Sequence, residues 1–336
     1  MIRSYWLILF VCIVVVSIPR FNREDIGPLK YFFQRTEQGL YDIDTEGLPF
    51  DVHQYVLNTR YFKGRDDLKE LLRPPWVNRP GVPFLASFLP FSALTSINII
   101  NIISIYIASI FLILLLKHLK FNFRLQVAGS LLFVFSFPNF AYGSSGYIDA
   151  SVISVLFITL YLLVKEKWFI IPFVILMGIF IKETIIVIIP VIFLYIYFHK
   201  KASFAFSYSL ILLSIYLIIA IIIRNFLQSD KFEYWLPSSE RFIFNVSRIK
   251  MWLNLVLSLG IPGFIALFNF NKVKNHMNPK ILLVLYTGFG LTILLFISSM
   301  FSAYADGRFI WPSYVFTIPI TAYILDHSKY LKFIFK

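Results

Sequence analysis

Long apolar segments separated by short charged segments make up most of this sequence. The first apolar run covers 4–19, and a long polar stretch follows it at 20–93. A membrane-crossing helix needs roughly 17 to 25 mainly apolar residues, so the pattern predicts an all-α integral membrane protein with about ten transmembrane helices. The nine later runs lie at about 94–116, 126–142, 148–164, 168–181, 184–198, 203–223, 249–269, 281–300 and 309–325.

Two parts of the pattern admit a second interpretation. The runs 168–181 and 184–198 are short and are parted only by Lys182 and Glu183, so they form either two spans or one long, broken helix. The run 4–19 is either an uncleaved signal anchor or a cleaved signal peptide. It lacks a small-x-small cleavage pattern after its apolar core, which favours the anchor.

Composition agrees with this fold class. Of the 336 residues, 58% are hydrophobic and only 15% are charged, which is more apolar surface than a soluble domain of this length buries. The chain is therefore expected to form a single polytopic membrane domain over 1–336. Its one cysteine provides neither a disulfide framework nor a thiolate metal site.

The net charge of +13 is placed as the positive-inside rule expects. With the N-terminus in the cytoplasm, the predicted cytoplasmic segments contain 14 lysines and arginines, against only Glu166 and Asp326 as acids. We therefore expect a multi-pass protein of the cytoplasmic (inner) membrane with both termini in the cytoplasm. Because the basic residues lie between apolar spans, we expect membrane lipids and no nucleic acid as partners.

The polar stretch 20–93 is the largest segment outside the predicted spans, and it is placed on the extracytoplasmic side. Apolar residues at helical spacing within 52–59 predict a helix that lies on the membrane surface and ends at Gly64. A second short helix is expected at 66–72, stopped by the prolines that follow. The apolar segment 83–91 is too short to cross, so an interfacial or re-entrant helix is expected there.

Several fragments on the predicted outer side occur in a suggestive order. "FDVHQY" and "PPWVNRPGVPFLASFLP" lie in the first loop, and "GSSGYIDA", "GIFIKET" and "DGRFIWPSYVFTIP" follow near the ends of later spans. Together with the hydropathy pattern, they resemble the polytopic GT-C glycosyltransferases of the mannosyltransferase-like superfamily. Proteins of that family transfer a sugar from a polyprenyl-phosphate carrier on the outer leaflet. The motif likeness covers about forty residues.

The resemblance implies an acidic catalytic base in the first outer loop. Asp51 occupies that place without an adjacent acid, and Asp42 and Asp44 of "YDIDTE" are the alternative carboxylates. An inverting sugar transfer needs a carboxylate that takes the proton of the acceptor hydroxyl. The other interpretation of Asp51 is structural, because a carboxylate in the first turn of a helix is favoured there in any case.

The same chemistry requires cations that stabilise the departing phosphate. Arg79, Lys182 and Arg308 are the candidates, since they lie on the predicted outer side and arginine contacts phosphate in a bidentate manner. Asp149 and Glu183 are candidate second acids. Lys182 and Glu183 form either a surface turn or a buried ion pair, and Arg308 would otherwise serve as a snorkelling anchor of the last span.

The sequence thus predicts an enzyme, a membrane glycosyltransferase of hexosyltransferase type that acts in glycan biosynthesis at the cell envelope. Its donor would be a polyprenyl-phosphate-linked sugar, and its acceptor a glycan, a lipid or a protein. A divalent metal ion is compatible with the carboxylates, although no spacing requires a cofactor. A lipid-linked glycan flippase or transporter and a surface-polysaccharide polymerase or ligase are the alternatives.

The tripeptide "NVS" at Asn245 is a glycosylation sequon on the predicted outer side.

Overall fold

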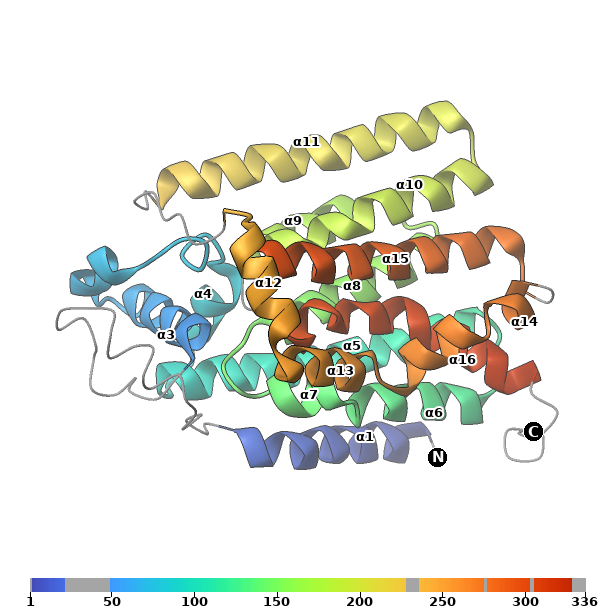
Figure 1. The fold of residues 1–336 in the computed structure, drawn as a ribbon, viewed down its shortest axis with the longest axis horizontal. Coiled ribbons are helices and arrows are strands. Elements are labelled where there is room, and N and C mark those ends of the chain that lie inside the picture. The colour runs from blue at the N-terminus through green and yellow to red at the C-terminus, as the bar shows by residue number, and fades with distance from the viewer. Residues whose placement is uncertain (1, 22–48, 228–235, 275–276, 303–304, 328–336) are drawn as a thin grey trace.

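All regular elements of the described chain are helices. The computed structural model of the protein describes residues 2–21, 49–227, 236–274, 277–302 and 305–327. Most of the longer helices follow the long axis of the molecule and pack side by side as a bundle (Figure 1). The predicted all-α class is confirmed for these residues.

Four helices are long and apolar enough to cross a membrane. Each begins and ends within a few residues of a predicted apolar run, because charged or polar residues flank these runs. They are α5 (Ala93–His118), α11 (Ala202–Phe226), α13 (Ile249–Phe268) and α15 (Pro279–Ser302). Several apolar helices of this kind indicate a multi-pass membrane protein.

Other apolar helices are shorter than a bilayer requires by itself. The count of ten spans therefore stays a prediction. These helices are α1 (Ile2–Ser17), α6 (Phe123–Val134), α7 (Phe137–Tyr142), α8 (Asp149–Val164), α9 (Ile171–Ile181), α10 (Ile188–His199) and α16 (Tyr314–His327). The small elements η1 (Ile18–Arg20) and α14 (Phe270–Lys274) complete this part of the fold.

Three predicted runs differ from the structure in their continuity. In the run 249–269, Gly260 has a non-helical backbone (φ +55°, ψ −173°) that kinks α13. The run 126–142 is divided into α6 and α7, because the side chain of Ser136 caps a new helix by accepting from the backbone N–H of Asn139, with Pro138 in the first turn. The run 309–325 begins as two 3-10 turns, η6 (Gly307–Phe309) and η7 (Trp311–Ser313), before α16 starts.

The segment 168–198 forms two helices and not one broken helix. Lys182 has an extended backbone between α9 and the 3-10 helix η4 (Glu183–Val187), which leads into α10. A Cβ at Gly178 would lie 2.8 Å from Cγ1 of Ile185, whereas seven residues of a continuous α-helix rise about 10 Å. The chain therefore reverses direction at Lys182.

The polar stretch folds at one end of the bundle. Its described part contains α3 (Phe50–Phe62), the 3-10 helix η3 (Asp66–Leu71) and α4 (Gly81–Ser87), which lie at the left of Figure 1. Helix α3 ends as expected, since Gly64 adopts a left-handed φ of +93°. The expectation that this helix has one apolar face and lies on the membrane surface was wrong. Every residue from 52 to 59 is buried, polar ones included, so neighbouring elements enclose α3 on all sides.

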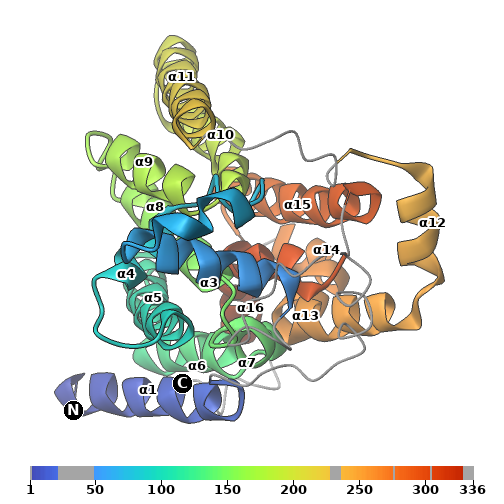
Figure 2. The ribbon, with the colours of Figure 1, turned by 90° about the vertical axis from the view of Figure 1, so that its left-hand side faces the viewer.

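The first and last described helices have their outer ends on the same side of the bundle. Helix α1 starts, and α16 finishes, at the end of the bundle opposite to α3 and α4 (Figure 1). Viewed from the α3 end, α3 crosses the middle of the bundle, α4 lies beside it over α5, and α12 (Ser239–Ser247) stands at the edge (Figure 2). Which end faces the cytoplasm stays a prediction.

Candidate functional site

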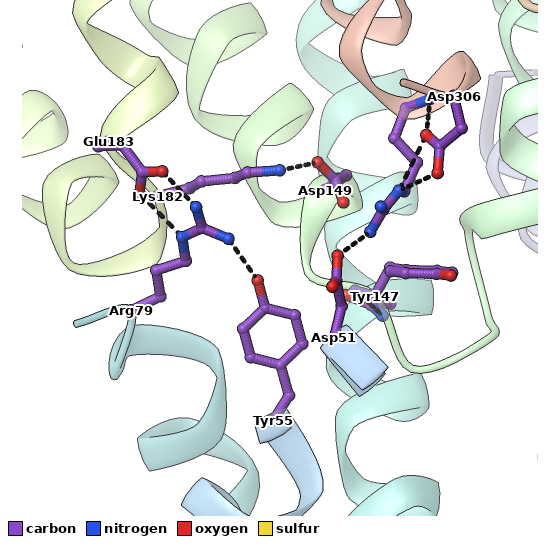
Figure 3. Close-up of polar contacts among 10 residues, drawn as sticks. Asp51, Tyr55, Arg79, Tyr147, Asp149, Lys182, Glu183 and Asp306 are labelled. Atoms are coloured by element: carbon purple, nitrogen blue, oxygen red, sulfur yellow. Dashed lines mark hydrogen bonds and ion pairs between the residues drawn. The ribbon is translucent and has the colours of Figure 1, made fainter. Parts of the chain in front are cut away.

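Charged and polar side chains gather at the end of the bundle where α3 and α4 lie (Figure 3). They come from the first turns of α3 and α8, the segment before α4, the junction of α9 with η4, and the turn η6. We call this group the polar cluster. Its members are Asp51, Tyr55, Arg79, Asp149, Lys182, Glu183, Asp306 and Arg308.

The first ion pair joins two segments that lie far apart in the sequence, the start of α3 and the turn η6. Nη1 of Arg308 donates to Oδ2 of Asp51 at 2.7 Å, across 257 positions of sequence. The Asp51 side chain is 24% exposed, whereas that of Arg308 is 9% exposed. A carboxylate in the first turn of α3 also interacts favourably with the helix dipole. The Asp51 carboxylate thus lies beside a cation and in contact with solvent.

Asp306 orients Arg308 from the other side. Its Oδ1 accepts from the backbone N–H of Arg308 at 2.9 Å, which caps the turn η6, and its carboxylate accepts from Nε of the same residue at 2.9 Å. Two carboxylates therefore share one guanidinium. Within the described residues, no group accepts a hydrogen bond from Nη2 of Arg308 or donates one to Oδ1 of Asp51.

Lys182 and Asp149 form the second ion pair, deep in the cluster. Nζ of Lys182 donates to Oδ1 of Asp149 at 2.5 Å, and both side chains are less than one-tenth exposed. The extended backbone of Lys182 ends α9 and directs this side chain toward the start of α8 (Figure 3). Asp149 is the only hydrogen-bond acceptor that Nζ has among the described residues, so two of its three N–H groups donate to no protein oxygen there.

Arg79 is the most completely bonded cation of the cluster. Its Nε and Nη2 donate to the two carboxylate oxygens of Glu183, and its Nη1 donates to the hydroxyl oxygen of Tyr55 at 2.9 Å. Burial raises the pKa of Tyr55 far above its ordinary value, so the hydroxyl stays protonated at neutral pH. Burial alone would lower the pKa of Arg79, but Glu183 and Tyr55 raise it.

Two aromatic rings complete the walls of the cluster. The guanidinium carbon of Arg308 lies 4.0 Å from the ring centroid of Tyr147, and Nζ of Lys182 lies 5.4 Å from that of Phe309. Cations at such distances are attracted by the electron-rich faces of the rings. Both rings are half-buried, so the cations are shielded from water on these sides.

The loop that carries Tyr147 is fastened to α5. Asn98 accepts from the backbone N–H of Gly146 at 2.7 Å, and Asn101 donates to the backbone carbonyl of Tyr147. Gly146 has a left-handed φ of +83°, and a Cβ there would lie 2.3 Å from Cγ1 of Val52. A glycine is therefore required where α3 crosses this loop.

The cluster contains four carboxylates and three cations, and they pair among themselves. Among the residues that the structure describes, no three histidine, cysteine, aspartate or glutamate side chains form a group that could hold a metal ion. The carboxylates of Asp51 and Asp149 face Arg308 and Lys182 instead. Each charge of the cluster thus has a neighbour of opposite sign.

Six predicted site residues meet in this cluster. The remaining two candidates, Asp42 and Asp44, lie outside the described residues. The six that come together are Asp51, Arg79, Asp149, Lys182, Glu183 and Arg308.

Sequence reasoning missed four residues of the cluster and its walls. Asp306 and Phe309 flank Arg308 inside "DGRFIWPSYVFTIP", and an aspartate two residues before an arginine is a common turn cap. Tyr147 lies in "GSSGYIDA", beside Asp149. Tyr55 follows Asp51 by one helical turn, and that spacing would have placed both on one side of α3.

No protein-family model matches this chain, and no curated protein sequence matches it. The resemblance to GT-C glycosyltransferases therefore stays a prediction from sequence fragments.

Proposed function

We propose that this protein is a multi-pass membrane glycosyltransferase of GT-C type. It would transfer a sugar from a polyprenyl-phosphate-linked donor to an acceptor hydroxyl, with inversion, at the membrane face where the polar cluster lies. The observation that carries the proposal is the Asp51–Arg308 pair, because it puts a partly exposed carboxylate beside a cation that retains a free donor.

Asp51 is proposed as the general base. Its Oδ1 takes the proton of the acceptor hydroxyl while the acceptor oxygen forms a bond to the anomeric carbon of the donor sugar. Arg308 binds the other carboxylate oxygen at 2.7 Å and fixes the orientation of the base. A positioned base of this kind contributes about 10²–10⁴-fold in rate.

Arg308 and Lys182 are proposed as the groups that stabilise the leaving phosphate. The bond between the anomeric carbon and the phosphate oxygen breaks as the acceptor bond forms, and its electron pair remains on the phosphate. Nη2 of Arg308 and two N–H groups of Lys182 have no acceptor among the described residues, so they are available to that charge.

Arg79 is proposed to act indirectly, contrary to the expectation that it binds phosphate. All three of its nitrogens donate to Glu183 and Tyr55, and its side chain is 3% exposed. Because Glu183 is the residue next to Lys182, this contact fixes the turn between α9 and η4. Arg79 is therefore a positioning residue for Lys182.

A transporter of lipid-linked glycans is the second candidate. The observation that favours it is the buried Lys182–Asp149 ion pair between apolar helices, because ionisable residues enclosed in this way mark substrate and ion pathways in transporters. Such a protein would move a lipid-linked sugar across the bilayer without breaking the bond between sugar and phosphate.

One experiment separates these two candidates. Purified protein is reconstituted in liposomes with a panel of radiolabelled polyprenyl-phosphate sugars and mixed glycan and lipid acceptors. Release of polyprenyl phosphate together with a labelled acceptor supports the transferase, whereas movement of intact donor between leaflets supports the transporter. Labelled polymer in place of a singly modified acceptor would indicate a polymerase or ligase.

A further inference from the structure

Helix α12 lies across the direction of the bundle helices. It runs transversely in both views (Figures 1 and 2), and Figure 2 shows it at the edge of the molecule. Only Arg248 separates its last residue, Ser247, from Ile249, the first residue of α13. Since α13 is long and apolar enough to cross a membrane, α12 is tied to the level at which that helix ends.

One flank of α12 completes the end of α15. Nδ2 of Asn245 donates to the backbone carbonyl of Met300 at 2.8 Å, and Nη1 of Arg241 donates to that of Ser302 at 2.8 Å. The last carbonyls of a helix have no partner within it, so these side chains satisfy groups that would otherwise need water. Asn245 is fully buried, which leaves its sequon closed to modification in the folded protein.

The same flank is connected to the polar cluster. Oδ1 of Asn245 accepts from the backbone N–H of Ala305 at 3.1 Å, and Ala305 immediately precedes Asp306, which caps the turn of Arg308. The position of α12 therefore sets where this turn begins. A displacement of α12 would be passed on to Arg308 through one side chain.

The other flank of α12 exposes large apolar side chains. Ile243 is 65% exposed and Phe244 is 46% exposed, and Ile249 and Trp252 continue this surface onto α13. Exposed apolar surface of this kind marks a contact with lipid or with another protein. The charged residues nearest to this flank at the α13 end are basic, Arg248 and Lys250.

Lipid is the occupant that these observations favour. The exposed flank leads directly into the apolar surface of α13, and α12 lies across the direction of the bundle helices, which favours a place for α12 at the membrane boundary where α13 begins. The indole N–H of Trp252 donates to the carbonyl of Val246 at 2.8 Å at this level. Tryptophan and basic residues are enriched at membrane interfaces, where anionic headgroups attract the latter.

We propose that α12 is an interfacial helix, with Ile243 and Phe244 in the boundary between headgroups and acyl chains of the leaflet on the α3 side. Its opposite flank, through Asn245, then fixes the turn of Arg308 relative to the bilayer surface. The proposal does not depend on which reaction the protein performs.

Depth measurements on the full chain test this placement. Cys12→Ala removes the only cysteine, and a nitroxide is then attached to Ile243→Cys or, in a second variant, to Phe244→Cys. Asp67→Cys in η3 and Ile211→Cys in α11 supply the reference positions, because both residues are exposed and only Ile211 lies in a candidate span. Each protein is reconstituted in nanodiscs of phosphatidylcholine and phosphatidylglycerol.

The readout is the accessibility of each nitroxide to oxygen, which concentrates in the bilayer, and to nickel-EDDA, which stays in water. We expect labels at 243 and 244 to collide with nickel-EDDA several-fold less often than the label at 67, and to lie at a shallower depth than the label at 211. Labels as accessible to nickel-EDDA as the one at 67 would overturn the proposal. Protection that is found in native membranes but not in nanodiscs would also overturn it, in favour of a protein partner.

Discussion

Arg308 reaches from the turn before α16 to Asp51 in the first turn of α3, and donates to its carboxylate at 2.7 Å. This contact closes the polar cluster, because Asp306 holds the other side of the same guanidinium at 2.9 Å. Arg308 bonds the two carboxylates through different nitrogens, Nε and Nη1, which the planar guanidinium group of arginine allows. Lysine has the same charge but a single nitrogen.

Arg308→Lys is therefore expected to impair function while retaining the charge. The ammonium group can replace one of the charge-assisted hydrogen bonds but not all of them, and each is worth about 1.5–3 kcal/mol. Donor turnover should fall, and the unfolding temperature in detergent should drop. The matched control is Arg65→Lys in the exposed Arg65–Asp67 pair, where both quantities should stay near the wild-type values. Equal effects of the two substitutions would argue against the role given to Arg308.

Lys182→Met should be among the most destabilising single substitutions in the cluster. It leaves the buried carboxylate of Asp149 without its cation, and breaking a buried ion pair in this way costs about 3–5 kcal/mol. Thermal unfolding in detergent measures the loss. Lys200→Met is the control, because the Lys200–Glu166 pair is about 40% exposed and such pairs contribute about 1 kcal/mol or less.

A second substitution then separates stability from function at the same pair. Removing both charges, with Lys182→Met and Asp149→Leu together, should recover much of the lost stability, since no uncompensated charge remains. Donor turnover should remain low in the double variant, because the cation proposed to stabilise the leaving phosphate is gone. Full activity in a stable double variant would show that the pair is only structural.

Tyr55→Phe tests the hydrogen bond by which Tyr55 holds Arg79 in place. The substitution removes the hydroxyl that accepts from Nη1 of Arg79 at 2.9 Å, in a fully buried place. A hydrogen bond to a charged group contributes about 1.5–3 kcal/mol, so the free energy of unfolding should fall by that amount. Tyr61→Phe makes the same chemical change in the same helix, at a hydroxyl with no partner among the described residues, and should have little effect.

Much of the fold could be predicted from hydropathy alone, for a physical reason. The helices α5, α11, α13 and α15 follow apolar runs between polar residues, and the cost of burying charge in lipid fixes their ends; the kink of α13 at Gly260 was not predicted. The division at Ser136 was missed because the residues around it are as apolar as the rest of the run. Only the capping serine and Pro138 mark the break.

The members of the site were more predictable than their pairing. Charged residues in a mostly apolar chain need partners, which singled out Asp51, Lys182 and Arg308. Sequence spacing carries no information on distances between separate helices, so the partner of each charge could not be assigned. The bonds of Arg79 to Glu183 and Tyr55 are the part of this pairing that the sequence did not indicate.

Gly146→Ala should lower the free energy of unfolding, because it strains the loop whose Tyr147 ring contacts Arg308. A left-handed backbone costs a residue with a side chain about 1–2 kcal/mol, and a Cβ 2.3 Å from Val52 adds an overpacking cost of about 1–3 kcal/mol. Gly64→Ala is the matched control, since Gly64 has a similar φ but no atom within 4 Å of the added carbon. The difference between the two unfolding free energies reports the clash alone, and equal losses would contradict this packing.

Release of polyprenyl phosphate by Asp51→Asn tests the central claim most directly. The asparagine has nearly the same shape and can still accept from Arg308, but it cannot take a proton from an acceptor hydroxyl. Turnover of a donor that wild type uses should fall by about 10²–10⁴-fold, with donor binding and unfolding temperature close to wild type. Asp67→Asn, an exposed aspartate outside the polar cluster, should turn over donor normally. Undiminished release by Asp51→Asn would contradict the account and return attention to Asp42 and Asp44.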